Sequence, residues 1–275
     1  MRDPGRDPER DAAPLPPQQT GEPTGPVVSL TINRYGLGSA WRGVTHMGRD
    51  HLHLRGVAGL RFYRLLGTGR GSDLTLGADL HRWARFGVWS SRAALGLFEE
   101  SPWRQRERER TAESYTLVLR PTRWHGSWGG GEPFGPASTV REETGVGGPG
   151  PLAVLTRATI RPARLASFWR AVPASQRGLR EQPGLLASLG LGEAPLLHQA
   201  TFSVWRGPAE LRAFAYASAG HREAIARTRR EDWYREELFA RFTVLSAGGT
   251  WDGHDPLRTV LTPTADTRPR NPSPP

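Results

Sequence analysis

The chain has 275 residues and a formal charge of +10 at neutral pH, with 37 arginines, no lysine and 27 acidic residues. It contains no cysteine, which excludes disulfides, iron–sulfur clusters, thiolate ligands to heme and thiolate catalysis. No apolar run approaches the roughly 18 residues of a membrane-spanning helix, and the first residues lack the apolar stretch of a secretory signal. We therefore expect no transmembrane segment and a cytoplasmic location.

The positive charge is carried by arginine alone. A basic surface can bind nucleic acid, but a uniform preference for arginine indicates a compositional bias rather than a set of phosphate sites. The densest charged run, residues 103–110, interleaves arginine with glutamate, as a solvent-exposed helix face does. We predict no nucleic-acid partner and leave peripheral contact with a membrane open.

Residues 1–26 form an extension rich in proline and polar residues, which we expect to be disordered. Residues 27–128 follow the order strand, helix, strand, strand, helix, strand. The elements expected there are a strand at 27–33, a helix around 37–53, strands at 59–67 and 82–89, a helix from about 91 and a strand at 114–119. The glycine- and proline-rich residues 129–150 are predicted to be a linker.

Residues 151–254 repeat this order. The elements expected there are a strand at 152–160, a helix opened by Pro162, paired strands at 184–191 and 196–205, a helix from about Pro208 and a strand at 237–246. In the first of these helices the apolar residues recur at helical spacing, so one face should pack on the sheet: Leu165, Phe168, Trp169 and Val172. The polar residues 255–275 are predicted to be a disordered tail.

The two halves resemble each other in sequence. Residues 86–89 (Phe-Gly-Val-Trp) align with residues 202–205 (Phe-Ser-Val-Trp), and further matches are Leu95 with Leu211, Phe98 with Phe214, residues 115–119 with 241–245, Trp128 with Trp251, and His81 near His198. Self-similarity of this kind indicates a duplicated unit. The order βαββαβ is that of the ferredoxin-like unit, whose sheet has one face uncovered by helices. We predict an α+β fold in which two tandem ferredoxin-like repeats pack sheet to sheet, forming within one chain the dimeric α+β barrel.

Long and unusual sequence blocks in the second half point to a family. They are residues 155–162, Phe168 with Trp169, and residues 190–199, 220–225, 233–242 and 249–257. Together these blocks resemble spheroidene monooxygenase, a carotenoid-biosynthesis enzyme of phototrophic bacteria. The first half matches through its opening strand and residues 59–63 and 67–69, and the chain departs from the family pattern before residue 27, at about 70–82 and in the linker.

The resemblance implies a heme-dependent oxygenase. Such an enzyme places a keto group at C2 of spheroidene-type carotenoids, using dioxygen and electrons from a ferredoxin. The expected partners are thus an apolar, carotenoid-like substrate and a ferredoxin-type electron donor, which a basic surface would suit if the donor is acidic. Two alternatives remain: a heme- or small-molecule-binding protein without turnover, and an oxygenase that acts on a substrate other than a carotenoid.

Because the chain lacks cysteine, histidine or tyrosine must hold any heme iron. His221 is the first candidate, since it falls at helical spacing on one stripe with Leu211, Phe214, Ser218 and Ile225. Related ferredoxin-like heme proteins hold iron through a histidine on this second helix, and residues 101–105 of the first half contain none. The resemblance therefore implies one heme per chain with His221 as axial ligand. A histidine that is only hydrogen-bonded within a partly buried helix is the alternative.

His198 is the second candidate for heme binding. It shares one face of its expected strand with Ala200, Phe202 and Val204, so a place in the core is the alternative. Four aromatic residues are candidates for the substrate pocket, with ordinary core packing as the alternative: Trp169, Phe202, Trp205 and Trp233. No residue is assigned a direct catalytic role.

Overall fold

The computed structural model describes residues 25–36, 38, 40–70, 77–136, 150–194, 196–217, 226–228 and 230–261. The predicted disorder of residues 1–24 and 262–275, and most of the predicted linker, therefore lie outside the described residues.

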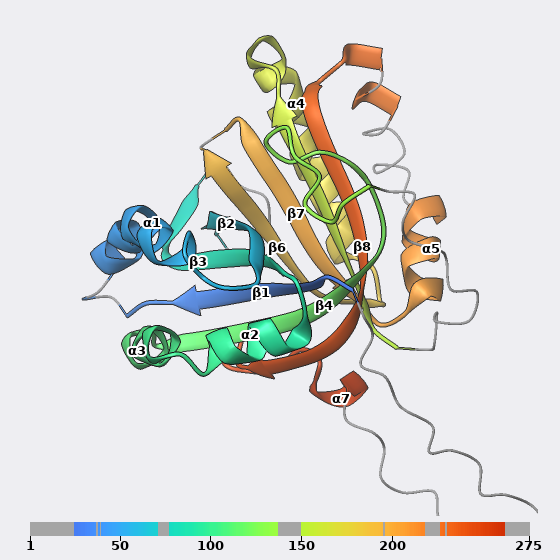
Figure 1. The fold of residues 1–275 in the computed structure, drawn as a ribbon. Helices are drawn as coiled ribbons and strands as arrows, with labels where there is room; N and C mark the ends of the chain where they lie inside the picture. The colour runs from blue at the N-terminus through green and yellow to red at the C-terminus, as the bar shows by residue number, and fades with distance from the viewer. Residues whose placement is uncertain are drawn as a thin grey trace, which may run out of the picture.

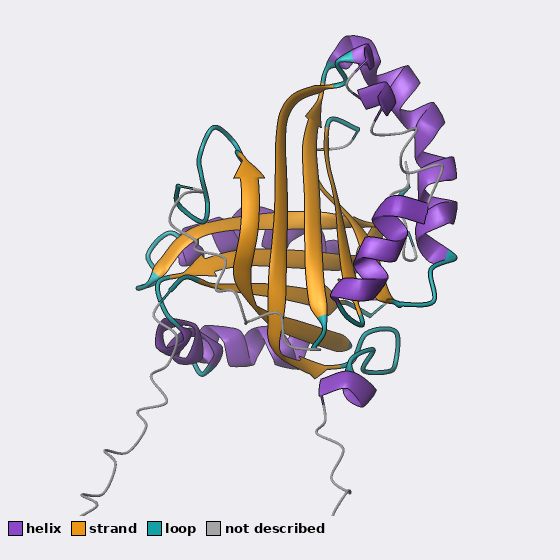
Figure 2. Ribbon diagram, turned by 90° about the vertical axis from the view of Figure 1, so that its right-hand side faces the viewer, coloured by secondary structure: helices purple, strands orange, loops and turns teal. Residues whose placement is uncertain are grey.

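Eight antiparallel strands form one closed barrel, with helices on its outer surface (Figures 1 and 2). The first repeat contains β1 (Val27–Arg34), α1 (Ala40–Leu54), β2 (Leu60–Gly69), β3 (Ala78–Trp89), α2 (Arg92–Glu99), α3 (Pro102–Arg110) and β4 (Glu113–Gly126). The second contains β5 (Leu152–Ile160), the short 3₁₀ helix η3 (Pro162–Arg164), α4 (Leu165–Arg180), β6 (Leu185–Ala194), β7 (His198–Trp205), α5 (Pro208–Ala217) and β8 (Tyr234–Gly249). A last short helix, α7 (Arg258–Leu261), follows.

The predicted α+β barrel of two ferredoxin-like repeats is confirmed. Around the barrel the strands follow the order β1-β3-β2-β6-β7-β5-β8-β4, so each repeat contributes four neighbouring strands in the ferredoxin-like order. The repeats meet edge to edge, through a long ladder between β4 and β8 and a short one between β2 and β6. Because these ladders close the barrel, the two sheets are joined by backbone hydrogen bonds as well as by their packed inner faces.

The internal sequence match corresponds to equivalent packing in the two repeats. Trp89 stacks on Phe98 with ring centroids 4.9 Å apart, and Trp205 stacks on Phe214 at 5.1 Å. Each tryptophan ends the third strand of its repeat, and each phenylalanine lies on the helix that follows. The outer face of each sheet is therefore anchored to its helix by the same aromatic pair.

Two details of the predicted internal alignment are wrong. Strand pairing places Thr116 opposite Thr31 in the first repeat and Phe239 opposite Thr156 in the second. In the last strands, residue 115 is therefore equivalent to residue 238, whereas the prediction aligned residue 115 with Arg241, three residues further along. Likewise Arg82, and not His81, holds the position of His198, because these residues pair with equivalent positions of β1 and β5.

The barrel interior is filled by apolar side chains from every strand, as expected for a small closed barrel. The residues that face inward and are fully buried include Leu30, Phe86, Leu117, Leu155, Leu189, Phe202 and Phe242. Phe134, from the predicted linker, packs edge-on against Phe242 with centroids 5.6 Å apart. Leu257, from the predicted tail, is also fully buried. The segments predicted as linker and tail therefore begin with residues that pack on the core. A single apolar side chain, Phe134 in the first and Leu257 in the second, holds each segment there.

A tight turn after the last strand of each repeat docks on the other repeat. The Trp128 turn is bridged to Gly131, and the backbone N–H of Gly130 donates to Glu236 on β8 at 2.7 Å. The equivalent Trp251 turn places the N–H of Gly253 2.6 Å from Glu113 on β4. The two repeats thus hold each other through the same hydrogen bond used twice.

We expect Gly126→Ala to destabilise the fold far more than Gly130→Ala. Both glycines have positive φ angles, of 90° and 75°. A Cβ at residue 126 would lie 2.1 Å from the carbonyl oxygen of Glu237, whereas a Cβ at residue 130 would have no described atom within 4 Å. The positive φ costs each variant about 1–2 kcal/mol, and the clash adds about 1–3 kcal/mol for Gly126→Ala alone. Chemical unfolding of both variants measures the difference; equal losses would contradict the clash.

Within the described part of the chain, no helix is long and apolar enough to cross a membrane.

Candidate functional site

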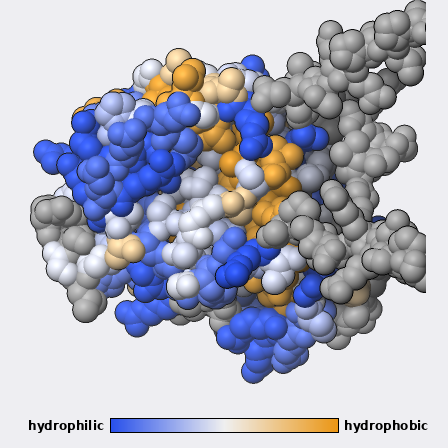
Figure 3. Space-filling view, turned by 90° about the horizontal axis from the view of Figure 1, so that it is seen from below, coloured by the Kyte–Doolittle hydropathy of each residue, from blue (hydrophilic) through white to orange (hydrophobic). Residues whose placement is uncertain are grey.

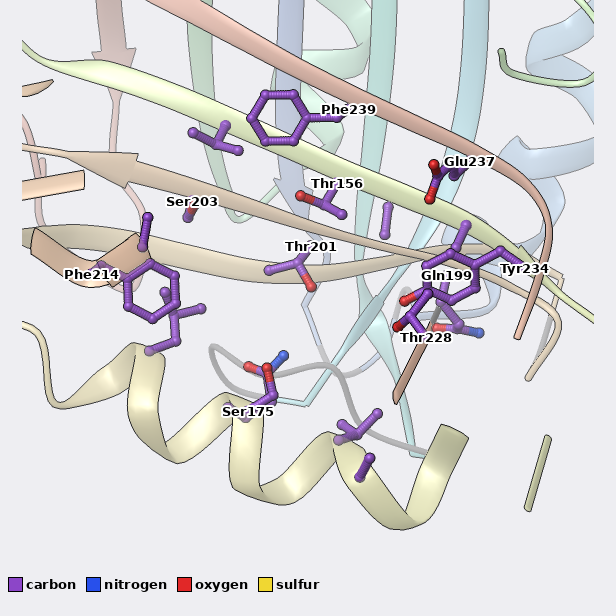
Figure 4. A pocket seen from close by; sticks show the side chains of 18 of the residues that line it. Thr156, Ser175, Gln199, Thr201, Ser203, Phe214, Thr228, Tyr234, Glu237 and Phe239 are labelled. Carbon is purple, nitrogen blue, oxygen red and sulfur yellow. The ribbon is translucent and has the colours of Figure 1, made fainter. Parts of the chain in front are cut away.

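A pocket of about 450 Å³ lies on the outside of the second repeat, between its sheet and its helices (Figure 4). Strands β5, β7 and β8 form the floor, and α4 and the end of α5 form the opposite wall. The volume falls within the roughly 300–1,000 Å³ typical of small-molecule sites. This face of the sheet is therefore only partly covered by its helices.

Small polar side chains on the floor leave the space open. Successive residues of a strand alternate between faces, so residues 199, 201 and 203 of β7 all point outward. Thr201 and Ser203 therefore share the floor with Thr156 of β5, and Figure 4 shows them facing the helix that carries Ser175. Thr156 is exposed although β5 is paired on both sides. Such exposure in the middle of a sheet is what a ligand-binding floor requires.

Apolar groups close both ends of the pocket. At one end Leu179 of α4 packs with Trp205, Leu211 and Phe214. At the other end Phe168 packs edge-on against Trp233, with ring centroids 5.9 Å apart. The pocket thus has an apolar end at Phe214, a middle with small polar side chains, and a second end where Phe168 and Trp233 lie beside polar groups.

Trp233 is fixed by hydrogen bonds behind the pocket wall. Its indole N–H donates to Glu231 at 2.8 Å, and Glu231 also accepts from Ser167 and from Arg227. Hydrogen bonds from Arg227, Ser167 and Trp233 lower the pKa of Glu231 to about 2. The carboxylate therefore stays ionised at neutral pH. It holds the segment that contains Trp233 against Ser167 of α4.

Ionisable groups also line the pocket near Tyr234. Burial raises the pKa of the Tyr234 phenol, and the nearby Glu237 raises it further, while a hydrogen bond with Thr228 opposes both. Glu237 and Arg241, both on β8, line the pocket as well. Tyr234 is consequently a neutral phenol at physiological pH.

The equivalent space in the first repeat is occupied by a buried ion cluster. Arg85 holds the position on β3 that Thr201 holds on β7, as their pairing with Thr31 and Thr156 shows. Its guanidinium lies 2.5 Å from Glu107 Oε1, and Asn33 Nδ2 donates to the same oxygen at 2.9 Å. Charged side chains thus take the place that remains open in the second repeat.

The prediction that residues 103–110 form a solvent-exposed face is wrong for two of them. The outward surface near α3 is hydrophilic (Figure 3), but Arg104 and Glu107 are 1% and 4% exposed and lie 2.7 Å apart. Residues three apart share one helix face, and here that face meets the sheet that carries Arg85. Burial opposes ionisation of Glu107, but the adjacent guanidiniums of Arg85 and Arg104 hold its pKa below the ordinary value.

Two of the four aromatic pocket candidates line the pocket. Trp205 and Trp233 do so, each at one of its ends. Phe202 lies on the inner face of β7, fully buried in the barrel, and is a core residue. Trp169 packs on Phe168, and its indole N–H lies 3.4 Å from the carbonyl oxygen of Leu196, outside the pocket lining.

The two candidate heme ligands are placed differently. His198 begins β7 on the face opposite the pocket, with Nδ1 3.8 Å from Glu193. His221 lies outside the described residues, but Ala215 before it and Thr228 after it both line the pocket.

Sequence reasoning missed the polar middle of the pocket. The alternate polar residues of β7, ending in Ser203, were a signal that this strand face is not packed core. On α4, extending the apolar stripe by one turn from Val172 leads to Gln176, whose position on the packed face marks it as unusual. Both signals become clear only when the two elements face each other.

Curated relatives match this chain over most of its sequence. No protein-family model matches the chain. Spheroidene monooxygenase of Rhodobacter capsulatus is 36% identical over 238 residues, covering 86% of this chain and 97% of the relative. The chain belongs to the spheroidene monooxygenase family. Spheroidene monooxygenases of Cereibacter sphaeroides and Rubrivivax gelatinosus match at 36% and 37% identity, over 76% and 72% of this chain and 64% and 74% of theirs.

Solved structures show the same fold at low sequence identity. An aldoxime dehydratase has a TM-score of 0.56 at 15% identity, covering 82% of this chain and 83% of its own. The aldoxime dehydratase OxdRE, in complex with butyraldoxime, has a TM-score of 0.53 at 12% identity, covering 80% of each chain. At such identities the likeness establishes the fold alone, whereas the spheroidene monooxygenase family membership makes the protein a monooxygenase.

Proposed function

We propose that this protein is a heme-dependent oxygenase that introduces a hydroxyl or keto group into a carotenoid or a related isoprenoid. Dioxygen would be the oxidant and a reduced ferredoxin-type protein the electron donor. The observation that carries the proposal is the pocket of the second repeat, whose apolar end suits the terminus of an apolar chain and whose polar side chains suit the group introduced there. Names of the three curated relatives support the substrate class.

The pocket size limits how much of such a substrate it can hold. A space of about 450 Å³ takes one end of a long polyene rather than the whole molecule. Phe214, Trp205 and Phe239 would contact that end through dispersion and exclude water from it. The remaining length would lie outside the described pocket, which fits oxidation near a chain terminus.

We propose His221 as the residue that holds the heme iron. Among the described pocket-lining residues, Tyr234 is the only one of a type that holds heme iron, and burial keeps its phenol protonated, which disfavours ligation. His221 lies in the segment between Ala215 and Thr228, both at the pocket. A bound heme would supply the iron that activates dioxygen. The protein's own contribution would be the axial imidazole, the dry walls and the orientation of the substrate end.

The opposite repeat explains why we propose one heme per chain. There the equivalent floor position is Arg85, whose ion pair with Glu107 occupies the space between sheet and helix. A planar apolar cofactor would have to displace two buried charges, at high cost. The formal charge of +10 supports an acidic donor protein, because opposite charge speeds the encounter of partners.

Absorption spectra and turnover test the proposal together. The purified protein should show a Soret band that shifts when dithionite and carbon monoxide are added. With reduced ferredoxin and spheroidene it should consume dioxygen and yield an oxygenated carotenoid. Absence of heme would overturn the mechanism, and heme without substrate-dependent oxygen consumption would favour a binding protein. Turnover of other isoprenoids but not of spheroidene would show that the substrate is not a carotenoid of this type.

A further inference from the structure

Two buried amides line the pocket, those of Gln176 and Gln199, and Gln176 has a buried side-chain oxygen without a hydrogen-bond partner among the described residues. We infer that Gln176 binds the hydroxyl group of an alcohol in the pocket, and thereby retains the alcohol that a first oxidation forms until a second oxidation converts it to a ketone. The retention step rests on the proposed function, whereas the preference for an alcohol can be measured without it.

Gln176 is a nearly buried polar side chain on the helical wall of the pocket. It lies on α4, lines the pocket and is 8% exposed. Its Oε1 has no hydrogen-bond partner among the described residues. A buried amide without a partner costs free energy, and native proteins seldom keep one without a reason. A ligand that supplies the missing partner would recover this cost on binding.

The neighbours of Gln176 leave the ligand as its natural partner. One turn before it on α4 is Val172 and, three residues after it, Leu179, neither of which can hydrogen-bond through its side chain. Across the pocket stand the hydroxyls of Thr201 and Ser203, and Ser203 Oγ already accepts the indole N–H of Trp205 at 3.0 Å. The polar middle of the pocket is therefore formed from both walls.

An alcohol matches a carboxamide better than any other small group. The amide offers one acceptor and two donor hydrogens, and a hydroxyl both donates and accepts. Rotation about the last side-chain torsion of glutamine is broad, so either end of the amide of Gln176 can turn to the ligand. A hydrocarbon offers neither donor nor acceptor and an ether oxygen only accepts, so the alcohol alone supplies the donor that Gln176 Oε1 lacks.

This difference between alcohol and hydrocarbon matters for a two-stage oxidation. Each stage breaks one C–H bond and consumes one dioxygen and two electrons from the donor protein with two protons. One oxygen atom enters the substrate as a hydroxyl and the other leaves as water. After the second stage the same carbon carries two hydroxyls and loses water to give the ketone. An enzyme that releases the alcohol too early stops halfway.

Binding is the first test. Farnesol and its dehydration product, the hydrocarbon farnesene, are titrated into the purified full-length protein while tryptophan fluorescence is followed, since Trp205 and Trp233 line the pocket. One neutral hydrogen bond predicts that wild type binds farnesol about 10-fold more tightly than farnesene. Gln176→Leu should lose this preference. Equal affinities in wild type, or a preference that survives in Gln176→Leu, would overturn the inference.

Product analysis is the second test. With spheroidene, Gln176→Leu should raise the ratio of alcohol to ketone about 10-fold. The matched control is Gln182→Leu, because Gln182 bonds the carbonyl oxygen of Gly178 at 2.9 Å outside the pocket. Its ratio should equal that of wild type. An unchanged ratio in Gln176→Leu sinks the retention step, whereas no oxygenated product from wild type sinks the proposed function and leaves the binding test to decide on Gln176.

Thermal unfolding separates this role from a structural one. Replacing an unpartnered buried amide by leucine should leave the melting temperature of the protein unchanged or raise it. If Gln176→Leu instead melts well below wild type, the amide supports the fold and the inference fails.

Discussion

His221→Ala is expected to abolish the Soret absorption of the purified protein while the barrel remains folded. Loss of the proposed imidazole ligand would remove the bond that holds the iron, and the described pocket offers only the protonated phenol of Tyr234 in exchange. Oxygenase activity should fall to background in the same variant. Circular dichroism and the absorption spectrum of one preparation measure both outcomes.

A matched histidine variant makes this result specific. His198→Ala should keep its Soret band, because His198 lies on the opposite face of β7 beside Glu193. Tyr234→Phe should keep it as well. Heme that stays bound in His221→Ala but disappears in His198→Ala would reverse the assignment. Unchanged spectra in all three variants would place the ligand elsewhere.

Glu107→Ala is expected to cost the protein about 3–5 kcal/mol of unfolding free energy, because it leaves buried guanidiniums without their carboxylate. Arg85 and Arg104 are 5% and 1% exposed, and both contact Glu107. Arg104 keeps a second carboxylate, Glu99, at 3.0 Å, whereas Glu107 is the one carboxylate paired with Arg85 among the described residues. Urea unfolding followed by circular dichroism measures the loss.

Two further variants isolate the buried charge as the cause. Glu109→Ala removes an exposed glutamate from the same helix and should change stability by less than about 0.5 kcal/mol. Arg85→Leu combined with Glu107→Leu removes the pair together and should recover much of the loss, since an apolar pair avoids the unpaired charge. A loss below about 1 kcal/mol in Glu107→Ala would show that water reaches the cluster.

Local sequence patterns predicted most of the fold, because the spacing of apolar residues over a few positions distinguishes strands from helices. The strand at residues 152–160 was predicted with the bounds of β5, and the aromatic pair Trp205 and Phe214 was already visible in the internal match. Strand β8 was predicted too short at both ends, since its first residues pair with β5 and its last residues, 247–249, pair with β4 of the other repeat. The strand ends that pair only when the barrel closes were thus the hardest to predict from the sequence.

The site was harder to predict than the fold. The aromatic candidates were chosen by residue type, and type alone does not distinguish Trp205 at the pocket from Phe202 in the barrel, whose positions differ by an odd number of residues along one strand. The burial of Glu107 was missed because its partner Arg85 is distant in sequence. The pocket itself results from small side chains on several strands, and no single segment encodes it.

The position shared by Arg85 and Thr201 has a consequence for how such a site can change. In a symmetric homodimer of single repeats, every substitution would appear in both subunits at once. A codon that closed one cavity would close the other. Joining the repeats in one chain gives each position its own codon, so arginine can reinforce one half while threonine keeps the other open. Covalent linkage thereby frees one repeat to serve stability and the other to serve chemistry.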